Sequence, residues 1–143
     1  MKHRFIGTWH LVSWELRSTD REPFYPLGKD AVGQLIYTAD GHMAVVLTKP
    51  GRVAFKSPWL MEGTPAEKID AMDSYSSYCG RYEVREQEGK VIHFVEHSLF
   101  PNWIGTAQER FFKLQGDRLE LSAALPLKDG IEQTVALVWE KTR

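Results

Sequence analysis

The sequence is poor in cysteine and in long hydrophobic runs. Cys79 is its one cysteine, which excludes an internal disulfide and any zinc site built from several cysteines. No apolar run approaches the roughly 20 residues that a membrane-spanning helix needs. The first residues, MKHRFIGTWHLVSWE, contain no continuous apolar segment like that of a secretory signal. We therefore expect a cytoplasmic protein with no membrane partner.

The chain also lacks an excess of either charge. Its 18 lysine and arginine residues nearly balance 19 aspartate and glutamate residues, and the formal net charge is -1. A chain with this balance has no strong attraction to phosphate groups or anionic lipids, so we expect no nucleic-acid partner. Motifs for nucleotide binding and for a serine nucleophile are missing too, namely the P-loop, the dinucleotide fingerprint and G-x-S-x-G.

What the sequence does contain is a series of short β-rich runs, separated by turn signals at intervals of about 10 residues. The turns TADGH, QEGK, QGDR and KDG each place Gly or Asp where positive φ is required, so neighbouring runs form hairpins. We predict one domain, residues 1–143, folded as an all-β, closed up-and-down antiparallel barrel of about 8–10 strands. The expected strands are Phe5–Arg17, Val32–Thr38, His42–Lys49, Tyr78–Gln87, Lys90–Ser98, Gly105–Leu114, Arg118–Ala124 and Ile131–Lys141, and a short one near Pro23–Pro26 is left open.

One segment departs from the β pattern. Thr64 has a side chain suited to a helix cap, a proline occupies the first helical position, and Glu67 follows three residues after the cap. Ile69 and Met72 then form an apolar stripe. We therefore predict one short helix near residues 65–76.

The turn around Gly116 predicts which side chains of the later strands face the barrel interior. If this glycine and the following aspartate form a two-residue loop, Phe112 lies opposite Leu121 on the inner face. Alternation along the same strand places Gln108 and Arg110 on that inner face as well.

A second turn, QEG, predicts the inner face of the strand that begins at Lys90. If QEG forms a three-residue loop with a left-handed glycine, Tyr82 lies opposite Phe94. Glu96 shares the face of Phe94 and would point inward, whereas His93 and His97 would point outward.

Together the two turns predict a site with a polar end and an apolar remainder. The ligand-binding candidates, all on the expected inner face, are Tyr78, Tyr82, Phe94, Glu96, Ser98, Gln108, Arg110, Phe112, Met43 and Trp139. Arg110 offers a planar set of donors that can bind the Glu96 carboxylate in two places. Three interpretations stay open: a satisfied structural network, a ligand site, and catalysis with Glu96 as general acid or base.

A metal site is not expected, although the chain has five histidines. His93 and His97 are four residues apart, and strand geometry would hold them roughly 13 Å from each other. Cys79 has no base partner identifiable in the sequence, so we expect no cysteine nucleophile. The segment LFPNWIG, residues 99–105, is most simply a loop folded over one mouth of the barrel.

Five blocks of sequence, in order, resemble the lipocalin-like domain family of bacteria and fungi. They are GTWHLVSWE, YPLGKDAVGQLIYTADGHMAVVL, YCGRYEV, SLFPNWIGTAQERFF and GDRLELS, within residues 5–141. The resemblance implies an antiparallel barrel with an internal cavity, and Trp9 would pack across its closed end. It implies no particular reaction or ligand. The longer G-x-W-x-G-x-G pattern of similar haem-binding barrels is missing after Trp9, so we expect no cofactor.

We expect the barrel to bind a small, mainly hydrophobic molecule that carries a polar group. This interpretation requires an internal cavity on the order of a few hundred cubic ångströms. The alternative is a cofactor-independent isomerase or cyclase that acts on a small hydrophobic substrate with Glu96 as acid or base. A protein-interaction module is a third interpretation and would need a large exposed apolar patch. The sequence leaves open whether the protein is an enzyme and whether it forms a homodimer.

Overall fold

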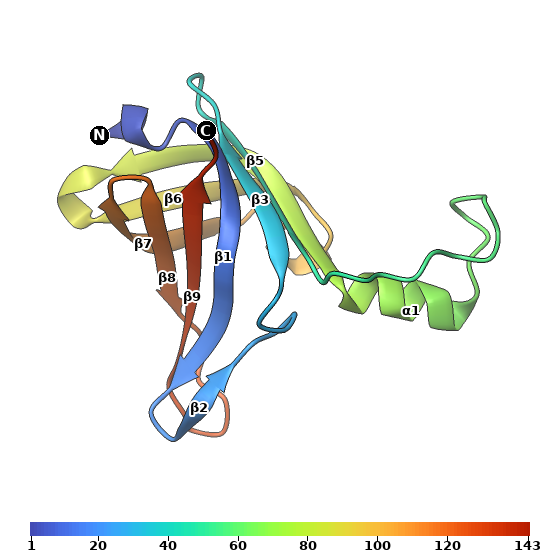
Figure 1. Ribbon diagram of the computed structural model, residues 1–143. Coiled ribbons are helices and arrows are strands. Elements are labelled where there is room, and N and C mark those ends of the chain that lie inside the picture. The colour runs from blue at the N-terminus through green and yellow to red at the C-terminus, as the bar shows by residue number, and fades with distance from the viewer.

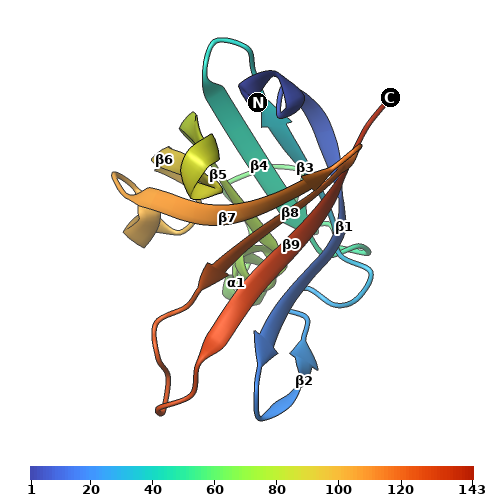
Figure 2. The ribbon, with the colours of Figure 1, turned by 90° about the vertical axis from the view of Figure 1, so that its left-hand side faces the viewer.

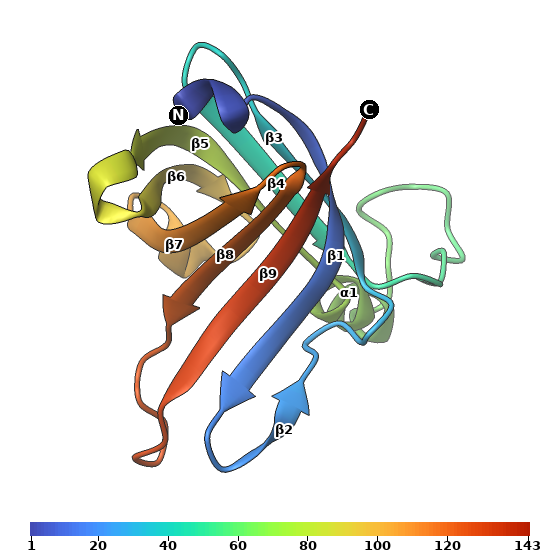
Figure 3. The same ribbon diagram turned by 60° about the vertical axis from the view of Figure 1, so that its left-hand side comes forward.

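The computed structural model describes residues 1–143 and shows a single closed sheet. Nine antiparallel strands follow one another in the order β2-β1-β3-β4-β5-β6-β7-β8-β9, and pairing of β1 with β9 closes the ring. Because β2 pairs with β1 only, eight strands form the barrel wall (Figures 1 and 3). The predicted closed up-and-down barrel is confirmed. The strands are β1 (Gly7–Ser18), β2 (Arg21–Phe24), β3 (Val32–Tyr37), β4 (His42–Thr48), β5 (Tyr75–Arg85), β6 (Lys90–Ser98), β7 (Ala107–Gln115), β8 (Arg118–Ala124) and β9 (Gln133–Lys141).

The N-terminal segment closes one end of the barrel. A 3-10 turn, η1 (Lys2–Arg4), leads into Phe5, which is fully buried with Trp9. The Trp9 indole N–H donates to the Phe5 carbonyl oxygen at 2.9 Å. The Phe5 ring meets the rings of Tyr37 and Phe112 edge to face, with centroids 5.6 and 5.0 Å away. These contacts satisfy the buried indole and make this half of the barrel a solid core.

The predicted helix is present as α1 (Pro65–Asp73) and begins with a capping box. The Glu67 backbone N–H donates to Thr64 Oγ1 at 3.2 Å, and Glu67 Oε1 accepts from the Thr64 backbone N–H at 2.9 Å. The expected apolar stripe has no partner, since Ile69 is 62% exposed and Met72 is 45% exposed. No helix of the structure is long and apolar enough to cross a bilayer.

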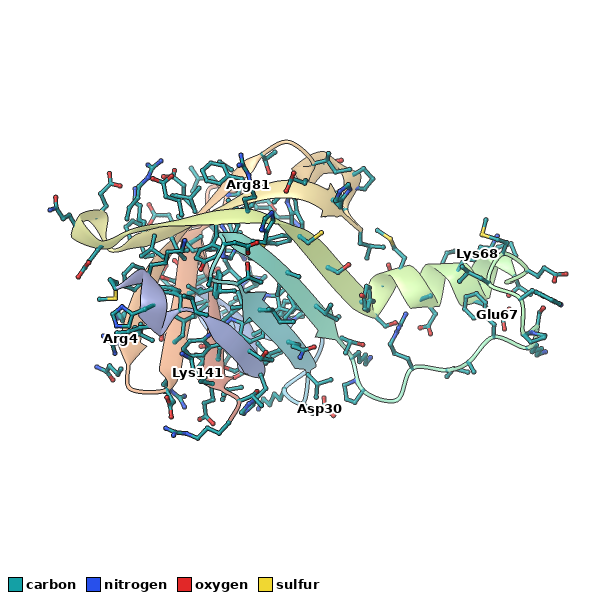
Figure 4. All side chains as sticks on the ribbon, turned by 90° about the horizontal axis from the view of Figure 1, so that it is seen from above. Arg4, Asp30, Glu67, Lys68, Arg81 and Lys141 are labelled. Carbon is teal, nitrogen blue, oxygen red and sulfur yellow. The ribbon has the colours of Figure 1, made fainter.

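Residues 50–73, which include α1, form an arm that projects from the barrel (Figures 1 and 4). Figure 4 shows Glu67 and Lys68 on the outer part of this arm. Its two ends meet, because the Lys49 backbone N–H donates to the Ser74 carbonyl oxygen at 3.0 Å. The arm is therefore an insertion in an otherwise continuous β4–β5 hairpin.

The two hairpins used to predict the inner face differ in outcome. The β7–β8 hairpin is as predicted, with Phe112 paired to Leu121. The β5–β6 loop is one residue longer than expected, since it begins at Glu86 and ends at the left-handed Gly89. Tyr82 consequently pairs with His93 and not with Phe94. A shift of one residue exchanges the two faces of a strand, so the predicted inner face of β6 was wrong.

A β-bulge in β6 changes the pattern a second time. Val95 pairs with Gly80 and His97 pairs with Cys79, which leaves Glu96 without a partner on β5. The two strands approach so closely here that a Cβ on Gly80 would lie 1.9 Å from the Phe94 carbonyl oxygen. Only glycine fits at this position.

Candidate ligand-binding site

A cavity of about 210 Å³ lies inside the barrel, away from the end that Phe5 and Trp9 close. Its lining includes Leu16, Leu125 and Val135, so it reaches the opposite end of the barrel. At this end β1 and β8 finish and β9 begins (Figures 2 and 3). Most of its wall is apolar and comes from the strands and from Leu125, which directly follows β8. The strand residues are Trp14, Leu16, Leu35, Val45, Leu47, Leu121, Val135, Leu137 and Trp139. Its volume is below the roughly 300–1,000 Å³ of typical small-molecule sites, so it suits only a small ligand.

The polar part of the wall centres on His93, which is 2% exposed. Its Nε2 atom lies 2.7 Å from the Tyr37 hydroxyl, and its Nδ1 atom lies 2.7 Å from the Tyr78 hydroxyl. The three side chains come from β6, β3 and β5, so the curvature of the barrel brings them together across its interior. His93 is held between two tyrosines with both ring nitrogens in use.

The hydrogen bonds of Tyr37 determine which nitrogen of His93 carries the proton. The Tyr37 hydroxyl is fully buried and has no acceptor other than His93, so donation to Nε2 satisfies its hydrogen. The proton of neutral His93 then lies on Nδ1 and is donated to the Tyr78 oxygen. The opposite tautomer would leave a buried Tyr37 O–H without an acceptor, at a cost of about 1–3 kcal/mol. The Tyr78 hydroxyl hydrogen is therefore free to point into the cavity that this residue lines.

Burial keeps all three of these side chains neutral near pH 7. Burial, and then the positive charge of Arg110, lower the pKa of His93 to about 3. Burial raises the pKa of Tyr78 to about 12 against the opposing charge of Arg110. Burial also raises the pKa of Tyr37 well above its ordinary value. The network donates and accepts hydrogen bonds without carrying charge.

Arg110 is the one charged side chain that lines the cavity. Its guanidinium donates to the Glu109 carbonyl oxygen at 2.9 Å and to Gln108 Oε1 at 3.2 Å. It takes part in none of the ion pairs of the chain. Because an arginine side chain stays protonated in proteins, the cavity holds a positive charge that no carboxylate neutralises.

A short relay of hydrogen bonds holds Arg110 in place. Gln108 accepts from Arg110 and donates through its Nε2 atom to Thr106 Oγ1 at 2.8 Å. Thr106 Oγ1 donates in turn to the Trp103 carbonyl oxygen at 2.6 Å. Trp103 belongs to the predicted loop at residues 99–105, and its ring lines the cavity beside Tyr78, with centroids 5.8 Å apart. The loop and β7 together orient the guanidinium.

Two tryptophans that line the cavity have indole N–H groups without a partner. The indole nitrogens of Trp14 and Trp139 are buried and have no hydrogen-bond partner. Buried donors normally have an acceptor, from the protein or from a bound molecule. Arg110 and the Tyr78 hydroxyl supply donors to the cavity itself, which suits a ligand that carries acceptor oxygens.

Three of the predicted site residues line the cavity: Tyr78, Arg110 and Trp139. Glu96 does not, because it is exposed on the outer surface of the barrel. The expected Glu96–Arg110 pair is absent, and Glu96 has no place from which to act as acid or base in the cavity. The prediction was wrong at this position because it took the β5–β6 loop to be one residue shorter and did not foresee the bulge.

The remaining candidates lie near the cavity or on other surfaces. Met43, Tyr82 and Phe112 belong to the core at the closed end, where the Tyr82 hydroxyl donates to the Thr38 carbonyl oxygen at 2.7 Å. Gln108 contacts Arg110 but does not line the cavity, and Ser98 Oγ accepts from the Phe100 backbone N–H at 3.1 Å. Phe94 lies with Glu96 and Arg81 in a shallow hollow on the outer face. The binding role predicted for these residues therefore has no support from their positions.

Sequence reasoning missed His93 and most of the apolar wall. His93 was placed on the outer face by the same shift that placed Glu96 inside. The apolar wall had a usable signal, because Val45 and Leu47 on β4, and Val135 and Leu137 on β9, alternate with residues of the other face.

The chain is similar to several known proteins. The family model described as "Lipocalin-like domain" matches residues 6–142. A relative from Aspergillus oryzae, the 4'-hydroxy-3'-methoxypropiophenone carrier protein ppsC, is 41% identical over 106 residues, which covers 69% of this chain and 96% of the relative. Among solved structures, insecticyanin from the tobacco hornworm Manduca sexta has a TM-score of 0.47 and 12% identity. That match covers 98% of this chain and spans 62% of insecticyanin. The match of the family model over nearly the whole chain shows that the protein belongs to the lipocalin-like domain family.

Proposed function

We propose that the protein is a carrier that binds one small oxygenated aromatic molecule in the barrel cavity. The observation that supports this most directly is the wall of the cavity, where a mainly apolar surface also carries the donors of Arg110 and Tyr78. An apolar wall favours an aromatic ring, because its burial removes apolar surface from water. The donors fix the orientation of the ligand by meeting its oxygens.

The relative from Aspergillus oryzae supports the choice of ligand class. Its name describes a carrier of 4'-hydroxy-3'-methoxypropiophenone, an aryl ketone whose ring bears a hydroxyl and a methoxy group. Such a molecule has several acceptor oxygens, which can meet the donors of Arg110 and Tyr78 on the cavity wall. We therefore use this compound as the probe for the cavity.

Calorimetric titration with the probe tests the proposal. We expect one binding site per chain, and we expect Leu137→Trp to weaken binding about tenfold or more, because the larger ring fills part of a cavity that Leu137 lines. Thr134→Trp is the matched control, since Thr134 is exposed on the same strand. Absence of binding to the unaltered protein, or equal binding by the folded Leu137→Trp variant, would contradict the proposal.

The cytoplasmic location stays a prediction, and the question of a homodimer stays open. Cell fractionation tests the first. Sedimentation at several concentrations tests the second. In that experiment we would substitute the exposed apolar residues of the arm, which are Trp59, Leu60 and Met61.

A further inference from the structure

The charge of Arg110 is unusual for the place it occupies. The guanidinium lines a mainly apolar cavity, and its described partners are two neutral oxygens, from Glu109 and Gln108. A charge that is partly removed from water is unfavourable unless an opposite charge or several hydrogen bonds compensate it. A ligand that brought a negative oxygen to Arg110 would supply the missing partner.

The other groups that face Arg110 do not compete for this role. Tyr37 on β3, Tyr78 on β5 and His93 on β6 are the titratable groups near it, and all are neutral at pH 7. No aspartate or glutamate lines the cavity. The interior therefore presents one positive charge and no negative charge to a bound molecule.

Tyr78 adds a neutral donor on the same cavity wall. Its oxygen accepts from His93 Nδ1, so its own hydrogen is left for a ligand. Because Tyr37 and His93 hold this hydroxyl in place, little conformational freedom is lost when it binds an acceptor.

We propose that the cavity binds its ligand as an oxyanion, the phenolate of an acidic phenol, with Arg110 and the Tyr78 hydroxyl contacting the ionised oxygen. This inference rests on the proposed carrier function and specifies the chemical form of the cargo. The phenol loses its proton to the solvent, and no bond other than O–H changes. A nearby cation stabilises the charged form, so binding lowers the pKa of the phenol.

The probe compound, 4'-hydroxy-3'-methoxypropiophenone, allows the ionisation of its phenol to be measured by absorption. An acyl group para to the hydroxyl withdraws electron density, so such a phenol is more acidic than tyrosine, and its phenolate absorbs at longer wavelength than its neutral form. The absorption spectrum of the bound probe, recorded across a pH series, reports its ionisation directly. We expect its apparent pKa in the complex to be lower than that of the free probe by about one unit or more.

Variants identify the residues responsible. In Arg110→Met, the pKa of the bound probe should return to that of the free probe. The same variant should bind the probe about tenfold more weakly or worse. Arg81→Met is the matched control, because Arg81 lies on the outer face of β5 (Figure 4) and its loss should leave both quantities unchanged. Tyr78→Phe should weaken binding of the phenolate, whereas Tyr75→Phe on the same strand should not.

A ligand control separates this inference from the carrier proposal. The 4'-O-methyl ether of the probe cannot ionise and should bind about tenfold more weakly than the probe at a pH above the probe's bound pKa. If neither compound binds, the carrier proposal fails. If both bind equally and the bound probe keeps its free pKa, the carrier proposal stands and the oxyanion inference is overturned. This comparison uses the unaltered protein, so it does not depend on the folding of any variant.

Discussion

At the scale of single residues, His93 connects the buried core of the barrel to the wall of the cavity. Its two nitrogens join Tyr37 to Tyr78, and this arrangement requires the neutral imidazole, since one nitrogen must accept. Protonation would break the bond with Tyr37 and would place a second positive charge near Arg110. We therefore expect acid to destabilise the folded protein through this residue.

The pH dependence of stability tests the role of His93. Its pKa is about 3 in the folded protein and 6.5 in the unfolded chain, so between these values the unfolded chain binds a proton that the folded protein does not. The stabilisation is complete above pH 6.5 and is lost as the pH falls toward 3, with a limiting slope of about 1.4 kcal/mol per pH unit. Urea unfolding at several pH values should show this slope in the unaltered protein but not in His93→Gln.

The control for this prediction is His97→Gln, which removes an exposed histidine from the same strand. It should retain the slope of the unaltered protein. His93→Gln should also be less stable at pH 7 by about 1–3 kcal/mol, because Tyr37 and Tyr78 lose their buried partner. Equal slopes for both variants would show that His93 is protonated in the folded protein as easily as in the unfolded chain.

The sequence could predict which side chains face the interior where the turn length is clear and strand alternation decides the rest. Arg110 and Phe112 follow from a two-residue turn whose length is unambiguous, and both face inward. The choice between Glu96 and His93 depended on the length of one loop, where the same glycine closes a loop of either length. Local residue preferences do not distinguish these two loops, although they place opposite side chains in the cavity.

At the scale of elements, the β6 bulge places side chains from one strand in two different environments. Before the bulge, His93 faces the cavity, and at the bulge Glu96 turns to solvent. At the bulge, β5 has room only for a glycine, at Gly80. The glycine on β5 and the extra residue on β6 therefore depend on each other. The bounds of β6 could be predicted from the sequence, but this irregularity could not, because the bulge depends on contact between two strands.

Gly80→Ala should destabilise the barrel strongly. The new Cβ would lie 1.9 Å from the Phe94 carbonyl oxygen, which is backbone and has little room to move. We expect a loss of about 2–4 kcal/mol in the free energy of unfolding, measured by urea denaturation. Cys79→Ala is the control, because it alters the adjacent residue with a small change in volume, and it should cost less than half as much. A fully stable Gly80→Ala variant would mean that β5 and β6 can separate at this point without cost.

At the scale of the whole molecule, the barrel and the arm are nearly independent. The barrel is closed by the pairing of β1 with β9. The arm at residues 50–73 leaves the sheet after Lys49 and rejoins it at Ser74, and a backbone hydrogen bond joins these two residues. The barrel could be predicted from sequence because tight turns connect neighbouring strands and force an antiparallel order. The exposure of the arm could not, since an apolar stripe on a helix normally indicates a buried face.

Replacement of residues 50–73 by an Asn-Gly turn should leave a folded barrel that still binds the probe. The β4–β5 hairpin would then close directly, because this turn suits two paired strands. The midpoint of thermal unfolding and the calorimetric affinity should both stay close to those of the full chain. Loss of binding with the fold intact would instead place the arm in the binding site.

The sealed end formed by Phe5 and Trp9 has a kinetic consequence. A ligand that reaches the cavity from the opposite end must leave by the same opening, because the buried core blocks passage through the barrel. By microscopic reversibility, a bulkier side chain at that opening slows capture and release by the same factor and leaves the dissociation constant unchanged. The residence time of the ligand can therefore vary among such barrels without any change in the ligand that they bind.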